Sequence, residues 1–124
     1  MKNKYGIDIW GDDNFFIEDG VVKVDYSCSP SLISIVKDIR KQGFKGPLLL
    51  RFPHITKKQI KTLFNAFNAS IKKYDYKGKF NAVFPLKVNQ LPNFIHPLVS
   101  AGKKYGYGLE AGSKAELIIA MTYN

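Results

Sequence analysis

The N-terminal part of the chain has the pattern of hydrophobic and polar positions expected of a β-hairpin. Residues 5–26 are rich in β-branched and aromatic side chains, and two β-rich runs, 15–17 and 21–24, lie on either side of Asp19 and Gly20. An Asp-Gly pair between two such runs is typical of the tight turn that joins antiparallel strands. We therefore predict β structure over this region, with a hairpin turn at the Asp-Gly pair.

Two helices with a short strand between them are predicted next. Ser29 and Pro30 have the form of an N-cap and a first helical residue, and the helix is expected to end at Gly43. Its apolar stripe has helical spacing and consists of Leu32, Ile35, Val36 and Ile39. The largely apolar run 48–52 predicts a short buried strand, and Thr56 is expected to cap the second helix. The buried stripe of that helix is Ile60, Leu63, Phe64, Phe67 and Ile71.

The second half of the chain alternates strands with helices. Strands are predicted at 80–88 and 105–111, and a helix is predicted at 91–104. A last helix is predicted to begin at Ser113. Ser113 and Glu116 have the spacing of a capping box. Strands that alternate with helices pair in parallel, so we predict an α/β fold.

The number of predicted strands is too small for a complete sheet of this kind. From about residue 47 the order is strand, helix, strand, helix, strand, helix, whereas a closed β/α barrel takes about 250 residues. We expect the N-terminal part of a TIM-like β/α barrel, incomplete in this chain and continued on its C-terminal side. The expected domains are an N-terminal β segment, 1–28, and the first units of the barrel, 29–124.

Composition indicates a globular chain with an excess of positive charge. The 124 residues are 45% hydrophobic, and 19 Lys+Arg against 10 Asp+Glu give a net charge of +9. Such a charge is compatible with binding to nucleic acid or to a membrane surface. The lysines are spread along the chain, mostly on polar faces of predicted helices and in turns, which favours a solvated surface instead. We expect no nucleic-acid partner.

Other features argue against a secreted or membrane protein. No apolar run approaches the roughly 20 residues that span a bilayer, and no long apolar stretch follows the charged N-terminus as it would in a signal peptide. Cys28 is the only cysteine, so the chain can form neither an internal disulfide nor a thiol-rich metal site. We expect a cytoplasmic protein with no membrane partner.

Two charged residues near the ends of predicted strands are the candidates for chemistry. One face of the strand 80–88 is apolar, and Lys87 is the only charge on the other face. Glu110 lies on the next strand among small and apolar residues. Catalytic groups lie at the C-terminal ends of barrel strands, and a desolvated lysine amine forms Schiff bases with carbonyl compounds. The spacing alone leaves two plainer interpretations open: Lys87 extends into water, and Glu110 forms a structural ion pair.

Three segments of the chain, taken in order, match one known family. They are Tyr5–Gly11, Val83–Gln90 and Gly108–Leu117. These segments resemble the bacterial biosynthetic arginine decarboxylases, and the second of them resembles the segment that carries the cofactor lysine. Phe52 and Pro53 before a helix fit the same family, so the resemblance covers nearly the whole chain.

The resemblance implies an alanine-racemase-like β/α barrel and a second, β-rich domain with which the segment 1–28 would associate. It implies an oligomeric lyase that decarboxylates L-arginine to agmatine and carbon dioxide in polyamine and spermidine biosynthesis, with pyridoxal phosphate and magnesium as cofactors. Lys87 would hold pyridoxal phosphate as a Schiff base, and Glu110 would lie near the cofactor.

The resemblance leaves part of the catalytic machinery unassigned. The glycine-rich phosphate site, the carboxylate at the pyridine nitrogen and the catalytic cysteine of the family are expected beyond residue 124, and Cys28 matches none of them. The magnesium ligands are unknown, and the fragment alone is expected to be inactive.

Two other functions stay open on the sequence. A decarboxylase or racemase of the same fold could act on ornithine, lysine or diaminopimelate, because the residues that contact the substrate side chain are not in this segment. A basic non-enzymatic binding module, with Lys87 as a surface charge, would instead bind nucleic acid in a salt-sensitive way and show no carbonyl chemistry.

Overall fold

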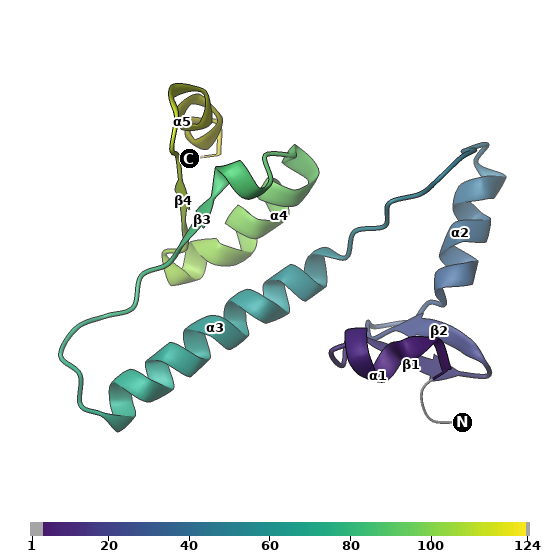
Figure 1. Ribbon diagram of the computed structural model, residues 1–124, viewed down its shortest axis with the longest axis horizontal. Coiled ribbons are helices and arrows are strands. Elements are labelled where there is room, and N and C mark those ends of the chain that lie inside the picture. The colour runs from purple at the N-terminus through teal and green to yellow at the C-terminus, as the bar shows by residue number, and fades with distance from the viewer. Residues whose placement is uncertain (1–3, 124) are drawn as a thin grey trace. The chain divides into compact units, whose positions relative to one another are not determined.

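The computed structural model describes residues 4–123 and shows a mixed α/β chain in two compact units. The first unit ends at Leu50, and the second begins at Arg51. In Figure 1 the first unit, purple to blue, holds the hairpin and α2, and the second, teal to yellow, holds the other helices and a parallel pair of strands.

The first unit is built around an antiparallel hairpin. Its elements in chain order are the 3₁₀ helix η1 (Lys4–Gly6), α1 (Ile7–Trp10), β1 (Phe15–Glu18), β2 (Val21–Val24) and α2 (Leu32–Lys41). β1 pairs with β2 so that Phe15 lies opposite Val24. Asp19 and Gly20 turn the chain with φ values of 51° and 75°, and a tight hairpin turn of this kind requires positive φ at both positions. The predicted hairpin is confirmed.

Residues 4–10 are helical and residues 11–14 form a turn before β1, so the prediction of β structure from residue 5 onward is wrong for this stretch. Trp10 Nε1 donates a hydrogen bond of 2.8 Å to the Tyr5 carbonyl, and the Gly11 N–H donates one of 2.8 Å to the Ile7 carbonyl. These bonds satisfy backbone groups within the segment itself, whereas a strand would need a neighbour to satisfy them.

The helix α2 begins two residues later than predicted, because Pro30 is tied to the hairpin. The Val24 N–H donates a hydrogen bond of 3.0 Å to the Pro30 carbonyl, and Ser29 has a left-handed φ of 42°. Ser31 is the N-cap instead of Ser29, and its Oγ accepts a hydrogen bond of 3.0 Å from the Ser34 N–H. The backbone around β2 therefore determines where the helix can start.

No strand forms at 48–52, so this prediction is also wrong for the chain as described. Leu49 is 77% exposed, and the segment pairs with no strand among residues 4–123. An apolar run becomes a strand only when a neighbour takes up its backbone hydrogen bonds. The predicted domain division after residue 28 refers to a longer protein and stays a prediction.

The second unit consists of helices around a short parallel pair of strands. Its elements are α3 (Pro53–Lys73), β3 (Val83–Pro85), η2 (Leu86–Val88), α4 (Pro92–Gly102), η3 (Lys103–Tyr105), β4 (Gly108–Glu110) and α5 (Lys114–Met121). β3 and β4 run parallel, with Val83 opposite Gly108. The predicted parallel pairing is confirmed, but both strands are shorter than predicted, and the described residues do not contain a closed barrel.

The helix α3 begins at Pro53, with Phe52 as its N-cap, so the prediction of Thr56 as the cap is wrong. Proline is well placed in the first turn of a helix, because the N–H that it lacks would have no partner there and its φ is already helical. The start of α3 is therefore set by Pro53, three residues before the predicted cap.

The core of the second unit lies where α4 packs against α3 (Figure 1). Ile60, Phe64 and Leu98 are its buried centre, and Phe64 stacks on Tyr105 with ring centroids 4.8 Å apart and meets Phe80 edge-on at 5.1 Å. Part of the predicted apolar stripe of α3 is exposed, since its members Leu63 and Phe67 are 38% and 45% exposed.

Candidate functional site

Lys87 lies in a turn just beyond β3 and not within a strand. β3 ends at Pro85, and the next three residues form the 3₁₀ helix η2. The predicted alternation of faces up to residue 88 is therefore wrong beyond Pro85, because β4 offers β3 only three residues of pairing. Lys87 is exposed, whereas its neighbour Leu86 is completely buried. The position still agrees with the expectation that matters for chemistry, which is the C-terminal end of a parallel strand.

Glu110 is the last residue of β4 and lies opposite Pro85 in the parallel register. Its Oε2 is buried and has no hydrogen-bond partner among residues 4–123. No salt bridge to Glu110 occurs within the described part of the chain, so the structural ion pair that the sequence left open is not found there. The structure thus places Lys87 and Glu110 at the same, C-terminal end of the strand pair. No salt bridge joins these two described residues.

The segment after Glu110 allows a close approach to this carboxylate. A Cβ atom built on Gly112 would lie 3.5 Å from both Glu110 Oε1 and Glu116 Oε2. Glu116 Oε2 accepts a hydrogen bond of 2.6 Å from the Gly112 N–H, and Ser113 Oγ accepts one of 3.2 Å from the Glu116 N–H. The predicted capping box is confirmed, with its return bond made to Gly112 instead of Ser113. This cap fixes the start of α5 beside the end of β4.

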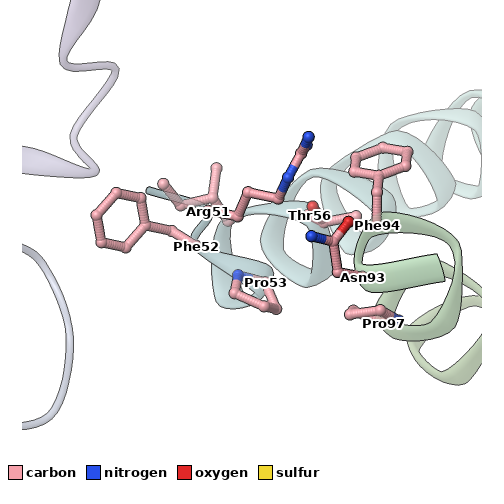
Figure 2. Close-up of a pocket in the computed structure, with 8 residues that line it drawn as sticks. Arg51, Phe52, Pro53, Thr56, Asn93, Phe94 and Pro97 are labelled. Atoms are coloured by element: carbon pink, nitrogen blue, oxygen red, sulfur yellow. The ribbon is translucent and has the colours of Figure 1, made fainter. Parts of the chain in front are cut away.

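A pocket in the second unit was not anticipated from the sequence. It has a volume of about 220 Å³ and lies between the first turns of α3 and α4, with Arg51 just before α3 (Figure 2). Its lining residues are Arg51, Phe52, Pro53, Ile55, Thr56, Asn93, Phe94 and Pro97. Neither Lys87 nor Glu110 lines it, so the pocket and the two charged residues are separate features. The prolines that open both helices indicate where each helix begins, but nothing in the sequence predicts that the two helix starts lie close together.

Other parts of the described chain offer no metal centre. Residues 4–123 contain no group of three or more His, Cys, Asp or Glu side chains placed to hold a metal ion, so the magnesium implied by the resemblance is assigned no ligand here. No described helix is both long and apolar enough to cross a bilayer. Near the start of β4, burial raises the pKa of the Tyr107 hydroxyl above its ordinary value of 10.0.

Comparison with known proteins connects this geometry to one kind of enzyme. The chain is 38% identical over 123 residues to the biosynthetic arginine decarboxylase of Prochlorococcus marinus strain MIT 9303, a match that covers 95% of this chain and 19% of that protein. It is 40% identical over 128 residues to the biosynthetic arginine decarboxylase of Tolumonas auensis, covering 97% of this chain and 20% of the relative. The predicted resemblance to these enzymes is confirmed.

A solved structure agrees with the sequence comparison. The crystal structure of the biosynthetic arginine decarboxylase of Campylobacter jejuni superposes with a TM-score of 0.93 at 59% identity, over 98% of this chain and 20% of the other. No protein-family model matches the chain. The chain thus spans about a fifth of the length of the arginine decarboxylases that it matches.

Proposed function

We propose that this chain is the cofactor-lysine segment of a pyridoxal-phosphate-dependent arginine decarboxylase, which converts L-arginine to agmatine and carbon dioxide in polyamine biosynthesis. The observation that carries the proposal is the match of 98% of the chain to the Campylobacter jejuni arginine decarboxylase at 59% identity. Because the chain spans only a fifth of that enzyme, the activity is proposed for a whole protein that contains this segment, and the segment alone is expected to be inactive.

The proposed architecture is the beginning of a β/α barrel. β3, α4 and β4 form a parallel strand, helix, strand unit, and α3 and α5 continue the alternation on either side. Leu117, Ile118 and Met121 on α5 are 54%, 66% and 68% exposed, and apolar side chains of this size are normally covered in a complete α/β domain. These exposed side chains support a larger barrel in which further elements pack on α5.

The residues at the end of the strand pair fit pyridoxal phosphate. The exposed amine of Lys87 is accessible to the aldehyde of the cofactor, and the buried Glu110 Oε2 is an acceptor that no described residue satisfies. Gly112 leaves room beside that carboxylate. When it is bound, pyridoxal phosphate supplies an electron-accepting ring that stabilises the negative charge left on the α-carbon as carbon dioxide departs.

Each of the two residues has a distinct proposed role. Lys87 would hold the cofactor covalently through Nζ, from its position just beyond the C-terminal end of β3. Glu110 accepts a hydrogen bond from the cofactor or the substrate at Oε2, which removes the cost of a buried acceptor without a partner. The structure assigns neither residue to recognition of the substrate side chain.

The remaining expectations depend on the whole protein. The names of the matched relatives favour arginine over ornithine, lysine or diaminopimelate as the substrate. Homo-oligomeric assembly, a cytoplasmic location, the absence of a nucleic-acid partner and a requirement for magnesium stay predictions.

The test is to locate the cofactor lysine. The protein encoded by the complete reading frame that contains this chain is purified with pyridoxal phosphate, reduced with borohydride and mapped by peptide mass spectrometry. We expect the label on Lys87 in the wild type, no label at this position in Lys87→Ala, and an unchanged label in the control Lys103→Ala, which alters an exposed lysine of η3. The wild-type protein is also incubated separately with arginine, ornithine, lysine and diaminopimelate. It should form agmatine from arginine and no decarboxylation product from the other three.

A folded wild-type protein with no label on Lys87 would contradict the proposal. The basic binding module would then be the function to test, and salt-sensitive binding to nucleic acid would be its signature.

A further inference from the structure

The turn that carries Lys87 is held only in part by the side chains at its centre. Lys87 is exposed, and Val88 is 66% exposed, so packing restrains both of them less than it restrains a buried side chain. On the N-terminal side Leu86 is completely buried and anchors the turn to the interior. The direction of the Lys87 side chain therefore also depends on what holds the chain on the C-terminal side of the turn.

Asn89 provides that second attachment. Its Oδ1 accepts a hydrogen bond of 3.0 Å from the Leu91 N–H, which closes a turn through the side chain. Leu91 is the N-cap of α4, and its carbonyl accepts hydrogen bonds of 2.9 and 3.0 Å from the N–H groups of Phe94 and Ile95. Ile95 is completely buried. The Asn89 side chain thus connects the residues after Lys87 to a helix start that is fixed in the interior.

Two prolines limit the freedom of the same segment. Pro85 has φ of −75° at the end of β3, and Pro92 is the first residue of α4. Each ring fixes one backbone dihedral, so the adjustable part of the segment is 86–91. Within that part the hydrogen bond from Leu91 to Asn89 is the side-chain constraint nearest to Lys87 on its C-terminal side.

We propose that Asn89 is a positioning residue that holds the Lys87 amine in the direction needed to bind the cofactor and to support decarboxylation. The inference rests on the proposed function, and Asn89 acts through the backbone without touching the reacting atoms. Removing its side chain costs little folding stability, because the bond is exposed and water can take its place. Misplacement of a reacting group by about an ångström can nevertheless lower a rate on the order of a hundredfold.

The test compares Asn89→Ala with Asn89→Asp in the complete protein, with Asn68→Ala as a control at an exposed position of α3. The aspartate keeps an oxygen that can accept the Leu91 N–H, whereas the alanine has none. The first measurement is hydrogen exchange of the peptide containing Leu91 in protein free of cofactor. The second is the rate at which borohydride fixes pyridoxal phosphate to Lys87. The third is kcat and KM for arginine at saturating cofactor.

We expect Asn89→Ala to raise exchange at Leu91 about fivefold, which corresponds to the loss of one ordinary hydrogen bond. We expect the same variant to slow labelling of Lys87 and to lower kcat about tenfold, with KM within about twofold of the wild type. Asn89→Asp should restore all three quantities to near wild-type values, and Asn68→Ala should change none of them.

Two results would overturn the positioning role while leaving the proposed function intact. One is an Asn89→Ala protein with faster exchange at Leu91 but wild-type labelling and kcat. The other is an Asn89→Asp protein as impaired as the alanine variant, since its acceptor is retained. A wild-type protein that never labels at Lys87 would overturn the proposed function, and the positioning role with it.

Discussion

At the scale of the residue, the two candidates that the sequence singled out differ in how the fold treats them. Lys87 is exposed in a turn, whereas Glu110 has a buried oxygen with no hydrogen-bond partner among the described residues. An unsatisfied buried oxygen destabilises the folded state, and such a cost is usual at sites that are built to receive a ligand. We therefore expect the Glu110 side chain to lower the stability of the folded chain while it contributes to function.

Replacing Glu110 by glutamine tests whether stability rises while activity falls. Glu110→Gln removes the negative charge and keeps the shape, so we expect the chain without cofactor to become more stable by about 1 kcal/mol. The decarboxylase activity that we propose for the complete protein should fall at least about tenfold, because the negative charge proposed to lie beside the cofactor is lost. Urea unfolding of the cofactor-free protein and agmatine formation measure the two effects. A variant that loses stability would show that Glu110 is held by partners within the fold.

At the scale of the element, local sequence signals located α2, α3, α4 and α5 but missed α1, and they did not locate every helix end. The hydrogen bond between Val24 and Pro30 delays the start of α2 until Ser31, and Pro53 opens α3 ahead of Thr56. The start of α2 is thus set by a backbone hydrogen bond to the hairpin, whereas the start of α3 is set by a proline, which lacks an N–H and has a fixed φ. Ser113 was identified correctly because its cap is completed entirely by residues within the same turn.

The two serines before α2 give a matched test of the observed cap. Ser31→Ala removes the acceptor for the Ser34 N–H, and we expect the free energy of unfolding to fall by about 1 kcal/mol. Ser29→Ala should change it by less than about 0.5 kcal/mol, because Ser29 precedes the helix and makes only an exposed bond to the Tyr26 carbonyl. Urea unfolding curves of both variants measure the two changes in the free energy of unfolding. An equal loss at Ser29 would mean that the helix starts where the sequence predicted.

At the scale of the whole molecule, the exposed apolar side chains indicate surfaces that further structure can cover. Leu49 in the first unit and Ile118 on α5 in the second are 77% and 66% exposed. Apolar groups of this size at the surface favour association with further structure. The match to about a fifth of the arginine decarboxylases is consistent with this interpretation.

A chimeric enzyme would test whether the chain can replace the matching segment of an arginine decarboxylase. In the chimera, this chain replaces the matching segment of the Campylobacter jejuni arginine decarboxylase. We expect a folded enzyme that forms agmatine within about tenfold of the parent rate, because hydrophobic cores tolerate extensive substitution when their patterning is kept. The same chimera with Lys87→Ala should form none. Circular dichroism confirms folding, and a folded but inactive chimera with intact Lys87 would argue against equivalence of the two segments.

The sequence alone determined what depends on neighbours along the chain. The Asp-Gly hairpin, the capping box at Ser113 and the parallel pairing implied by alternating strands and helices follow from local chemistry and periodicity. The tertiary structure decided what depends on distant partners. β3 ends at Pro85 because only three residues of β4 pair with it, and this places Lys87 in a turn instead of a strand. The burial of Glu110 Oε2 was likewise beyond the sequence, because burial is a property of the side chains that surround an atom in space.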